Sequence, residues 1–295
     1  MTEPDNNQAP QAQGLALDAL LPAEMAVKAE GAGVRKAGQP ALTLFMLAVL
    51  AGAFIALGAV FSTAVSAGAA GGSLPAGVVR LIAGVAFSLG LILVVVGGAE
   101  LFTGNNLIVM AWASKKVTTG ALLRNWGIVY AGNFAGGLAT AVLVVMSGHL
   151  LMQGGSPGAG LLMLAKHKCS LEFWPALWLG VLCNALVCLA VWMCMSARSV
   201  TDKVLVIVPP VAAFVVAGFE HCVANMYYIP CAVMFRDSAP ESFWQQTGLV
   251  ASDFASVNWQ QMLKANLLPV TIGNIIGGSV LVAGVYWAVY LRGRK

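Results

Sequence analysis

Charged residues are scarce in this sequence. Of its 295 residues only 9% are charged, whereas 59% are hydrophobic, and a soluble domain carries roughly a quarter charged residues. Several apolar runs reach about 20 residues, which is long enough to cross a hydrocarbon core of about 30 Å. A membrane-crossing run has to be helical or part of a closed barrel, and continuous rather than alternating apolarity favours helices. The sequence therefore predicts an all-α integral membrane protein.

Missing motifs narrow the function. The chain has no HExxH, no P-loop and no GxGxxG after a strand, so common hydrolase, NTPase and dinucleotide chemistries have no support. Its six cysteines form no CxxC pair, which indicates buried thiols rather than disulfides or metal ligands. The net charge of +4 is dispersed at the ends of the expected helices and gives nucleic acid no basic patch. We expect no enzyme activity, no cofactor, no metal site and no nucleic-acid partner.

Three regions follow from the distribution of polarity. We expect residues 1–14 to form a disordered tail and residues 15–37 to form an amphipathic surface helix. We expect residues 38–293 to form a six-span domain. The expected spans are about 41–69, 80–113, 125–152, 174–196, 203–235 and 264–291. With the N-terminus inside, 11 of the 16 lysines and arginines fall on that side. Basic residues favour the cytoplasmic side, so we expect both termini in the cytoplasm.

An internal repeat relates the two halves of the six-span domain. Residues 98–105 (GAELFTGN) match residues 218–225 (GFEHCVAN) at Gly, Glu and Asn, and residues 132–137 (GNFAGG) match residues 273–278 (GNIIGG). Two halves of three spans insert with opposite orientation, which makes an inverted repeat. In such folds broken helices meet near the midplane and build a solute site, so we expect the second and fifth helices to be broken.

Ionisable groups inside spans are costly and mark candidate sites, here Glu100, Glu220 and His221. A break after Glu100 would expose backbone N–H groups that suit an anion; alternatively, each glutamate satisfies the N–H groups of its own break. His221 can change protonation near neutral pH, so it could hydrogen-bond or protonate a monovalent anion. The alternative is a histidine that only packs helices.

Further polar residues have two interpretations each. The Thr103 hydroxyl could contact an imidazole or an oxyanion, or bond its own backbone. Asn184 could bond between helices or face the pathway. Lys166, His167 and Lys168 predict a basic outer loop that could attract anions, or one that is merely solvated.

Four segments resemble the motifs of formate/nitrite transporters: AELFTGNN (99–106), CNALVCLAVW (183–192), GFEHCVANMYYIP (218–230) and LLPVTIGNIIGG (267–278). The resemblance covers roughly residues 20–293. It implies an aquaporin-like homopentamer in the bacterial inner membrane, with one pore in each protomer. It also implies a gating role for the N-terminal helix, residues 20–37.

The resemblance also assigns site residues. It places the central anion and proton site at His221, Thr103, Glu220, Asn184 and Lys168. It implies an outer hydrophobic slit at Phe87 and Phe214, an inner slit at Leu91, Leu101, Phe102 and Val187, and a helix break at Glu100, Gly104, Asn105 and Asn225. In the family the slits exclude hydrated ions, and protonation at the histidine is thought to let the anion cross as its neutral acid, which agrees with the cost of a bare charge in an apolar constriction.

The expected cargo is formate, from the resemblance of Ile229-Pro230 and the LPVTIGN segment (268–274) to formate-type members. Residues 103–106 depart from the formate channels, so nitrite and hydrosulfide remain alternatives, with acetate, lactate and protons as further solutes. A non-conducting membrane sensor or scaffold is the alternative from another class. A scaffold needs no titratable group between the repeats, so Glu100 and His221 favour a pH-dependent channel or transporter.

Overall fold

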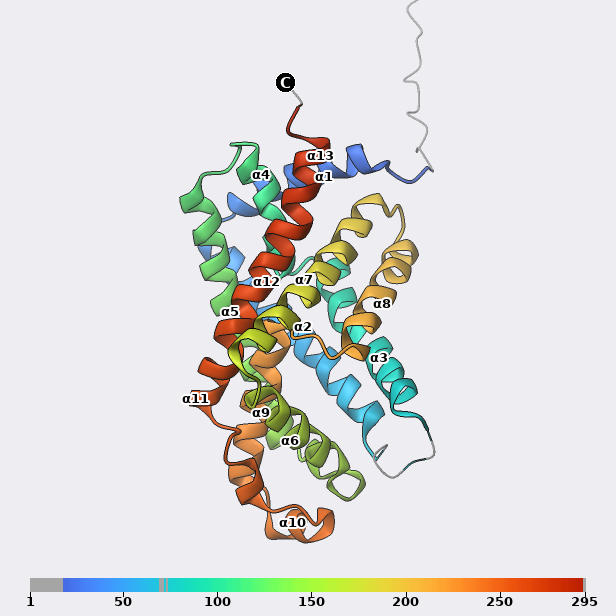
Figure 1. Ribbon diagram of the computed structural model, residues 1–295, viewed down its shortest axis with the longest axis vertical. Coiled ribbons are helices and arrows are strands. Elements are labelled where there is room, and N and C mark those ends of the chain that lie inside the picture. The colour runs from blue at the N-terminus through green and yellow to red at the C-terminus, as the bar shows by residue number, and fades with distance from the viewer. Residues whose placement is uncertain (1–17, 69–71, 73, 294–295) are drawn as a thin grey trace, which may run out of the picture.

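The computed structural model describes residues 18–68, 72 and 74–293, so the predicted tail 1–14 lies outside the described residues. Within those ranges the chain is helical and contains no strand, as Figure 1 shows. The first half comprises α1 (Pro22–Ala37), α2 (Ala41–Ser66), α3 (Ala76–Gly97), the 3₁₀ helix η2 (Gly104–Ile108), α4 (Val109–Ala113) and α5 (Thr119–Met146).

The second half repeats this order after two short 3₁₀ helices, η3 (His149–Leu151) and η4 (Gln153–Gly155). It comprises α6 (Ser156–Cys169), α7 (Phe173–Ser196), α8 (Val200–Val216), α9 (Cys222–Ser238), α10 (Glu241–Thr247) and the 3₁₀ helix η5 (Ala251–Phe254). The last span is built from α11 (Trp259–Gln261), the π-helix η6 (Met262–Leu267), α12 (Leu268–Ile275), the π-helix η7 (Ile276–Gly284) and α13 (Val285–Tyr290). A short helix therefore precedes three spans in each half.

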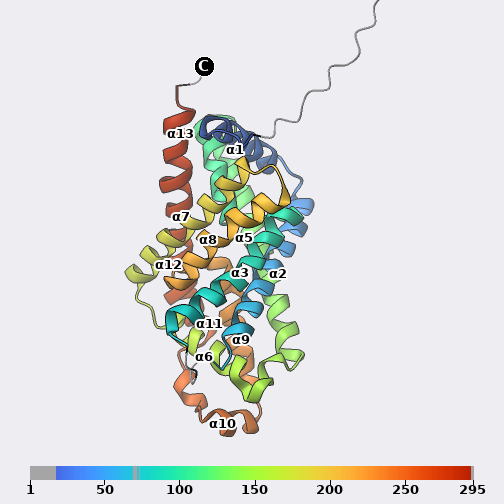
Figure 2. The ribbon, with the colours of Figure 1, turned by 90° about the vertical axis from the view of Figure 1, so that its right-hand side faces the viewer.

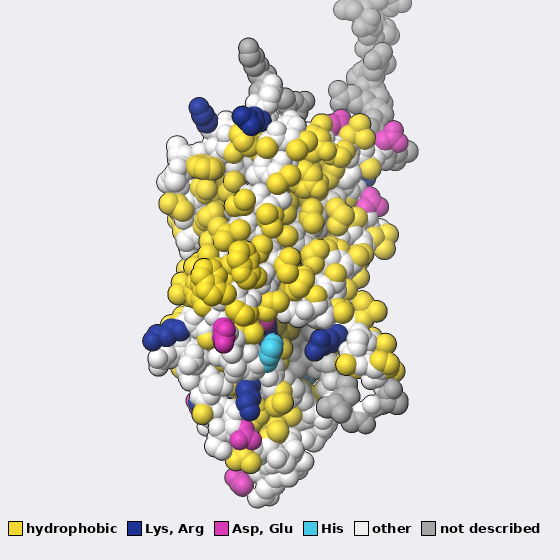
Figure 3. Space-filling view, viewed as in Figure 1, with side chains coloured by type: hydrophobic (Ala, Val, Ile, Leu, Met, Phe, Trp, Pro, Cys, Tyr) yellow, Lys and Arg dark blue, Asp and Glu magenta, His cyan; other side chains and the backbone are white. Residues whose placement is uncertain are grey.

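The predicted spans correspond to these helices. The second and fifth predicted spans each cover more than one helix, because the helix is broken in both. Five stretches of the described residues are long and apolar enough to cross a membrane: α2, α3, α5, α7 and the stretch Ala251–Tyr290. The fifth predicted span, 203–235, is divided into α8 and α9, each of 17 residues and each too short alone. Figure 3, viewed as in Figure 1, shows a broad apolar belt on the face turned to the viewer, with most charged side chains beyond the two edges of the belt.

Two local predictions need correction. The basic segment 166–168 was expected in a loop but forms the last turn of α6. The Gly- and Pro-containing start of that helix resembles a loop, yet Pro157 lies in the first turn, where a proline costs no hydrogen bond.

The N-terminal helix was expected from residue 15 but α1 begins at Pro22, where Glu24 accepts the Leu21 N–H at 2.9 Å.

Glycines bring the spans into close contact at matching places. A Cβ at Gly136 of α5 would lie 2.0 Å from the Val49 carbonyl oxygen of α2, and one at Gly277 would lie 2.1 Å from the Val181 carbonyl oxygen of α7. Small residues allow such backbone approach between membrane helices. The repeated GNFAGG and GNIIGG segments thus form equivalent helix contacts in the two halves.

The two short helices lie at opposite ends of the bundle. In both ribbon views α1 lies beside α13 at one end, whereas α6 and α10 lie toward the other (Figures 1 and 2). We call these the α1 end and the α6 end. The break after α3 leads toward the α1 end and the break after α8 toward the α6 end, which is the arrangement of an inverted repeat.

Candidate functional site

Both breaks begin in the same way. Gly98 and Gly218 follow α3 and α8 in left-handed conformations, with φ of 78° and 71°. Glycine adopts this conformation without the steric cost that a side chain adds. Beyond each glycine the chain leaves the helix, and the Glu100 N–H donates to the Leu47 carbonyl at 3.2 Å. The equivalent Glu220 N–H donates to a carbonyl of α7.

Asn133 supports the first break from α5. Its Oδ1 accepts the Phe102 N–H at 2.8 Å, and its Nδ2 donates to the carbonyls of Ala48 and Glu100 at 2.7 and 2.9 Å. A buried amide that makes three such bonds satisfies backbone groups that the missing helical turn leaves free.

Asn274 supports the second break with the same set of bonds. Its Oδ1 accepts the Cys222 N–H at 3.0 Å, and its Nδ2 donates to the carbonyls of Gly180 and Glu220 at 2.8 and 2.9 Å. The asparagine of each repeated GN segment therefore has an identified structural task.

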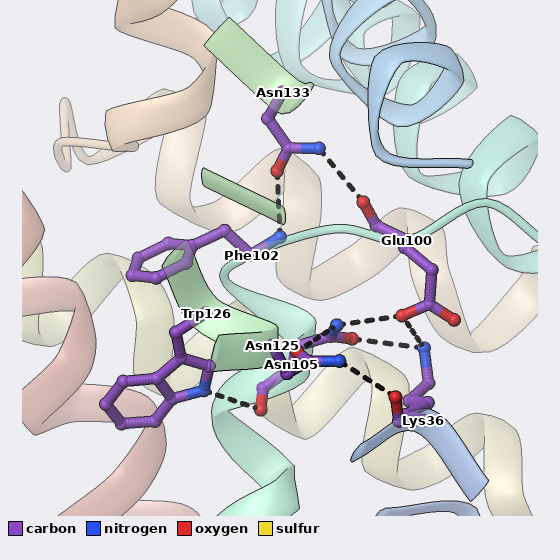
Figure 4. A network of polar contacts seen from close by, with 7 residues as sticks. All are labelled: Lys36, Glu100, Phe102, Asn105, Asn125, Trp126 and Asn133. Carbon is purple, nitrogen blue, oxygen red and sulfur yellow. Dashed lines mark hydrogen bonds and ion pairs between the residues drawn. The ribbon is translucent and has the colours of Figure 1, made fainter. Parts of the chain in front are cut away.

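The α1-end cluster consists of Lys36, Glu100, Asn105 and Asn125 (Figure 4). The Lys36 ammonium donates to Glu100 Oε2 at 2.7 Å and to Asn105 Oδ1 at 3.0 Å. Asn105 Nδ2 donates to Glu100 Oε2 and to Asn125 Oδ1, and Asn125 Nδ2 returns to the Lys36 carbonyl. The carboxylate is thus neutralised by a lysine of α1, which ties that helix to the break.

The α6-end cluster consists of Lys168, Glu220, Asn225 and Asn266. The Lys168 ammonium donates to Glu220 Oε1 at 2.8 Å, and Asn225 Nδ2 donates to Glu220 Oε2 at 2.7 Å. Asn266 receives a second bond from Asn225 and donates to Glu220 Oε2 at 3.0 Å. This buried carboxylate is therefore paired and hydrogen-bonded by side chains. The expectation that each glutamate satisfies the backbone N–H groups of its own break is not met, because Asn133 and Asn274 accept those N–H groups instead.

His221 lies between the two clusters at the start of α9. Its Nδ1 accepts the Ala224 N–H at 3.1 Å. A backbone N–H can only donate, so in the neutral imidazole the proton resides on Nε2. Nε2 lies 3.0 Å from Thr103 Oγ1, and the imidazole therefore donates to that hydroxyl. This contact joins the two halves at a buried point, because His221 is 3% exposed and Thr103 is fully buried.

A small central cavity of about 10 Å³ lies next to His221. It is lined by Ile55, Phe87, Leu91, Leu101, Val187, Val211, Phe214 and His221. This volume holds about one water molecule, and seven of the eight lining side chains are apolar. The Phe87 and Phe214 rings meet edge to face at 5.7 Å, and the Phe214 ring stacks on the imidazole at 6.0 Å.

A larger cavity adjoins each side of the central one. The α6-end vestibule, of about 310 Å³, shares Phe87, Phe214 and His221 with the central cavity. The α1-end vestibule, of about 350 Å³, shares Leu91 and Leu101 with it. The three cavities therefore form one line through the molecule, with the narrow apolar segment and His221 in the middle.

Both vestibules carry basic side chains. Arg80, His167 and Lys168 line the α6-end vestibule, and Lys28, Lys36 and Lys203 line the α1-end vestibule. Burial and, secondarily, the nearby Arg198 and Lys203 charges lower the pKa of Lys28. The positive charge at both mouths favours the entry of anions.

Three predicted site residues, Thr103, Phe102 and Asn184, do not line the three cavities, although Thr103 contacts His221. Phe102 is not among the residues that line the central cavity or the two vestibules; its ring packs edge-on against Tyr130 and Trp126, at 5.0 and 6.2 Å. The arrangement therefore gives no support to Phe102 as part of the inner slit. Asn184 Nδ2 donates to the carbonyls of Thr103 and Asn274, so it acts as an interhelical tie. Gly104 does line the α1-end vestibule.

Sequence reasoning did not identify several members of the site. Lys36, Asn125 and Asn266 complete the two clusters, and Ile55 and Val211 line the central cavity. The sequence did contain a signal for the two asparagines. Asn125 precedes Asn133, and Asn266 precedes Asn274, by the same distance of about two helical turns. The apolar pair carries no signal that separates it from other residues of its spans.

Comparison with known proteins agrees with this arrangement. A family described as "Formate/nitrite transporter" matches residues 23–288. The chain belongs to the formate/nitrite transporter family. The formate channel FocA of Escherichia coli strain K12 is 47% identical over 275 residues, which are 93% of this chain and 96% of FocA. FocA of Haemophilus influenzae is 41% identical over 274 residues, 93% of this chain and 95% of that protein.

A solved structure extends the likeness to the fold. The structure titled "Pentameric formate channel with formate bound" shares 46% identity and a TM-score of 0.81, over 85% of this chain and 98% of that one. The predicted family and the predicted all-α fold of a membrane channel are thereby confirmed. The chain is an integral membrane protein of a family whose relatives are named as channels and transporters.

Proposed function

We propose that the chain forms a homopentameric, pH-dependent channel that carries formate and related small monovalent anions. The line of three cavities with His221 at its narrowest part is the observation that carries the proposal. Relatives named as formate channels, and a similar pentameric structure titled as holding formate, support this cargo and assembly. We infer transport rather than catalysis, in the bacterial inner membrane with the α1 end and both termini in the cytoplasm.

The geometry accounts for selection by size and charge. Basic side chains gather anions in either vestibule, and the central cavity is too small for a hydrated ion. A bare anion in this apolar segment is costly unless a donor compensates it. The Nε2–H of His221 is such a donor. Uptake of a proton from a vestibule at Nδ1, in place of the Ala224 bond, would convert His221 to the imidazolium. Transfer of the Nε2 proton to the carboxylate would then leave a neutral imidazole and let the solute cross as the neutral acid. Thr103 orients this N–H across the boundary between the halves.

Uptake into proteoliposomes tests the proposal. Labelled formate, nitrite and hydrosulfide are supplied in turn over a range of external pH. We expect formate uptake to exceed that of the other two and to rise as external pH falls, because a step that consumes a proton speeds up with proton supply. Absence of uptake for all three would refute the channel, and nitrite or hydrosulfide flux well above formate flux would refute the cargo.

A His221→Phe variant tests the central residue. The aromatic ring keeps the packing against Phe214 but has no N–H, so we expect pentamer assembly without pH-dependent uptake. Unchanged pH dependence in an assembled variant would remove His221 from the mechanism.

A further inference from the structure

A fourth cavity, separate from the pathway, lies at the α1 end between α1, the turn after α4, and α13. It has a volume of about 680 Å³, larger than either vestibule, and shares no lining residue with the α1-end vestibule. Val27 and Glu30 of α1 form one wall, and Trp287 and Leu291 form another. We call it the lateral pocket.

The lateral pocket is strongly basic. Lys115, Lys116 and Arg292 line it, against the single carboxylate of Glu30. The Lys116 ammonium pairs with Glu30, whose side chain is 8% exposed, while that of Lys116 is 56% exposed. Lys115 and Arg292 are exposed and form no ion pair within the described part of the chain. The lining thus has an excess of two positive charges and free N–H donors.

Its walls are held in place by backbone and side-chain bonds. Lys115 adopts φ of 61°, which is unusual for a residue with a side chain, and the Lys116 N–H donates to the Ala111 carbonyl at 2.9 Å. Trp287 Nε1 donates to Ser114 Oγ at 3.0 Å, which fixes the last span to this turn. Two adjacent lysines are therefore presented from a defined turn.

The surroundings place this pocket at the edge of the apolar belt. Val285 and Val289 of the last span are 51% and 65% exposed, and Trp112 before the turn is 41% exposed. Exposed aliphatic residues on a membrane span face lipid tails or, in an oligomer, a neighbouring protomer, and both mark the depth of the hydrocarbon core; tryptophans prefer the level of the headgroups. The cationic lining therefore lies close to where lipid phosphates are found.

We propose that the lateral pocket binds a phosphate-bearing anion through Lys115, Lys116 and Arg292. Arginine offers phosphate a two-point contact and lysine a compact charge, and basic pockets between membrane helices accept anionic headgroups. A phospholipid headgroup or a free phosphate ester could supply the same chemistry. Because Glu30 opposes the charge of the site, it weakens the affinity for any such anion.

The test measures binding to the intact pentamer in detergent by calorimetric titration. One arm uses a soluble short-chain anionic phospholipid, with its zwitterionic counterpart as reference, and the other uses inorganic phosphate. We expect Lys115→Ala with Arg292→Ala to weaken binding at least about tenfold, since two charge-assisted contacts are lost. Lys264→Ala removes one charge at the α6 end and should leave binding unchanged.

The variants and arms separate the outcomes. Glu30→Gln should tighten binding several-fold, which simple loss of structure would not do. Binding of the lipid alone identifies a headgroup site, and binding of both identifies a general phosphate site. The proposal is overturned if neither probe binds, if the zwitterionic lipid binds equally, or if the double variant keeps the native affinity.

Discussion

The α1-end and α6-end clusters contain the same residue types, one glutamate, one lysine and two asparagines, but they hold the lysine differently. Lys36 donates to both Glu100 and Asn105 and is 32% exposed, whereas Lys168 donates to Glu220 alone and is 8% exposed. Asn225 Oδ1, the equivalent of the oxygen that Lys36 contacts, has no hydrogen-bond partner among the residues that the structure describes. The α6-end lysine therefore keeps free N–H donors beside a vestibule that it lines.

A second difference lies in the register after each glutamate. Leu101 follows Glu100, and His221 follows Glu220, and both side chains line the central cavity. The supporting asparagines bond the next backbone N–H in each half, at Phe102 and Cys222, so the two positions are equivalent. At the position that lines the central cavity, one half thus carries an imidazole and the other a leucine. In the proposed mechanism the repeat builds the path and this difference supplies the proton chemistry.

Removal of each carboxylate should show the largest effect. In Glu220→Ala the buried Lys168 loses its counter-charge, and breaking a buried pair in this way costs about 3–5 kcal/mol. In Glu100→Ala the more exposed Lys36 can turn toward water, so we expect less than half of that loss. Thermal unfolding of the detergent-solubilised pentamer measures both, and equal losses would contradict the distinction between the clusters.

Substitution at the two equivalent positions that line the central cavity, Leu101 and His221, should have the next largest effect. His221→Leu gives both halves a leucine, and we expect uptake at low external pH to fall about 100-fold or more, because an acid–base group contributes at least that factor. Leu101→His in this variant restores an imidazole from the other half. Liposome flux measures both variants; native uptake in His221→Leu would show that the asymmetry is not functional.

The glycine contacts should respond equally in the two halves. Gly136→Ala and Gly277→Ala each place a methyl group against a carbonyl of the adjacent span, at 2.0 and 2.1 Å before any relaxation. We expect each to destabilise the protein by about 1–3 kcal/mol through overpacking. Thermal unfolding compares them, with Gly120→Ala, which meets no atom within 4 Å, as the control. A loss in one half only would show that the scaffold is less symmetric than its contacts.

Much of this comparison was predictable because the repeat leaves a signal in the sequence. The matching Gly, Glu and Asn spacings predicted both breaks, and unbroken apolar runs predicted the spans. The partners of the glutamates were harder to find, since Lys36 lies 64 residues from Glu100 and its contact depends on how α1 folds across the bundle end. The sequence alone also could not distinguish Leu101, which lines the cavity, from Phe102, whose ring points to Trp126 and Tyr130.

The smallest effect should come from the charges at the two mouths. Arg80 at the α6 end and Lys203 at the α1 end line the vestibules without belonging to either cluster. Each acts on anions through a screened field, so Arg80→Ala should reduce uptake about two- to threefold at low salt and less at about 0.15 M, where the Debye length is about 8 Å. Lys203→Ala should reduce efflux by a similar factor. Because the first step from either side is entry into a vestibule, each variant should affect mainly flux that starts at its own end. Initial rates from liposomes of known protein orientation measure this, and a reduction that persists undiminished at high salt would mean that the residue contacts the anion directly.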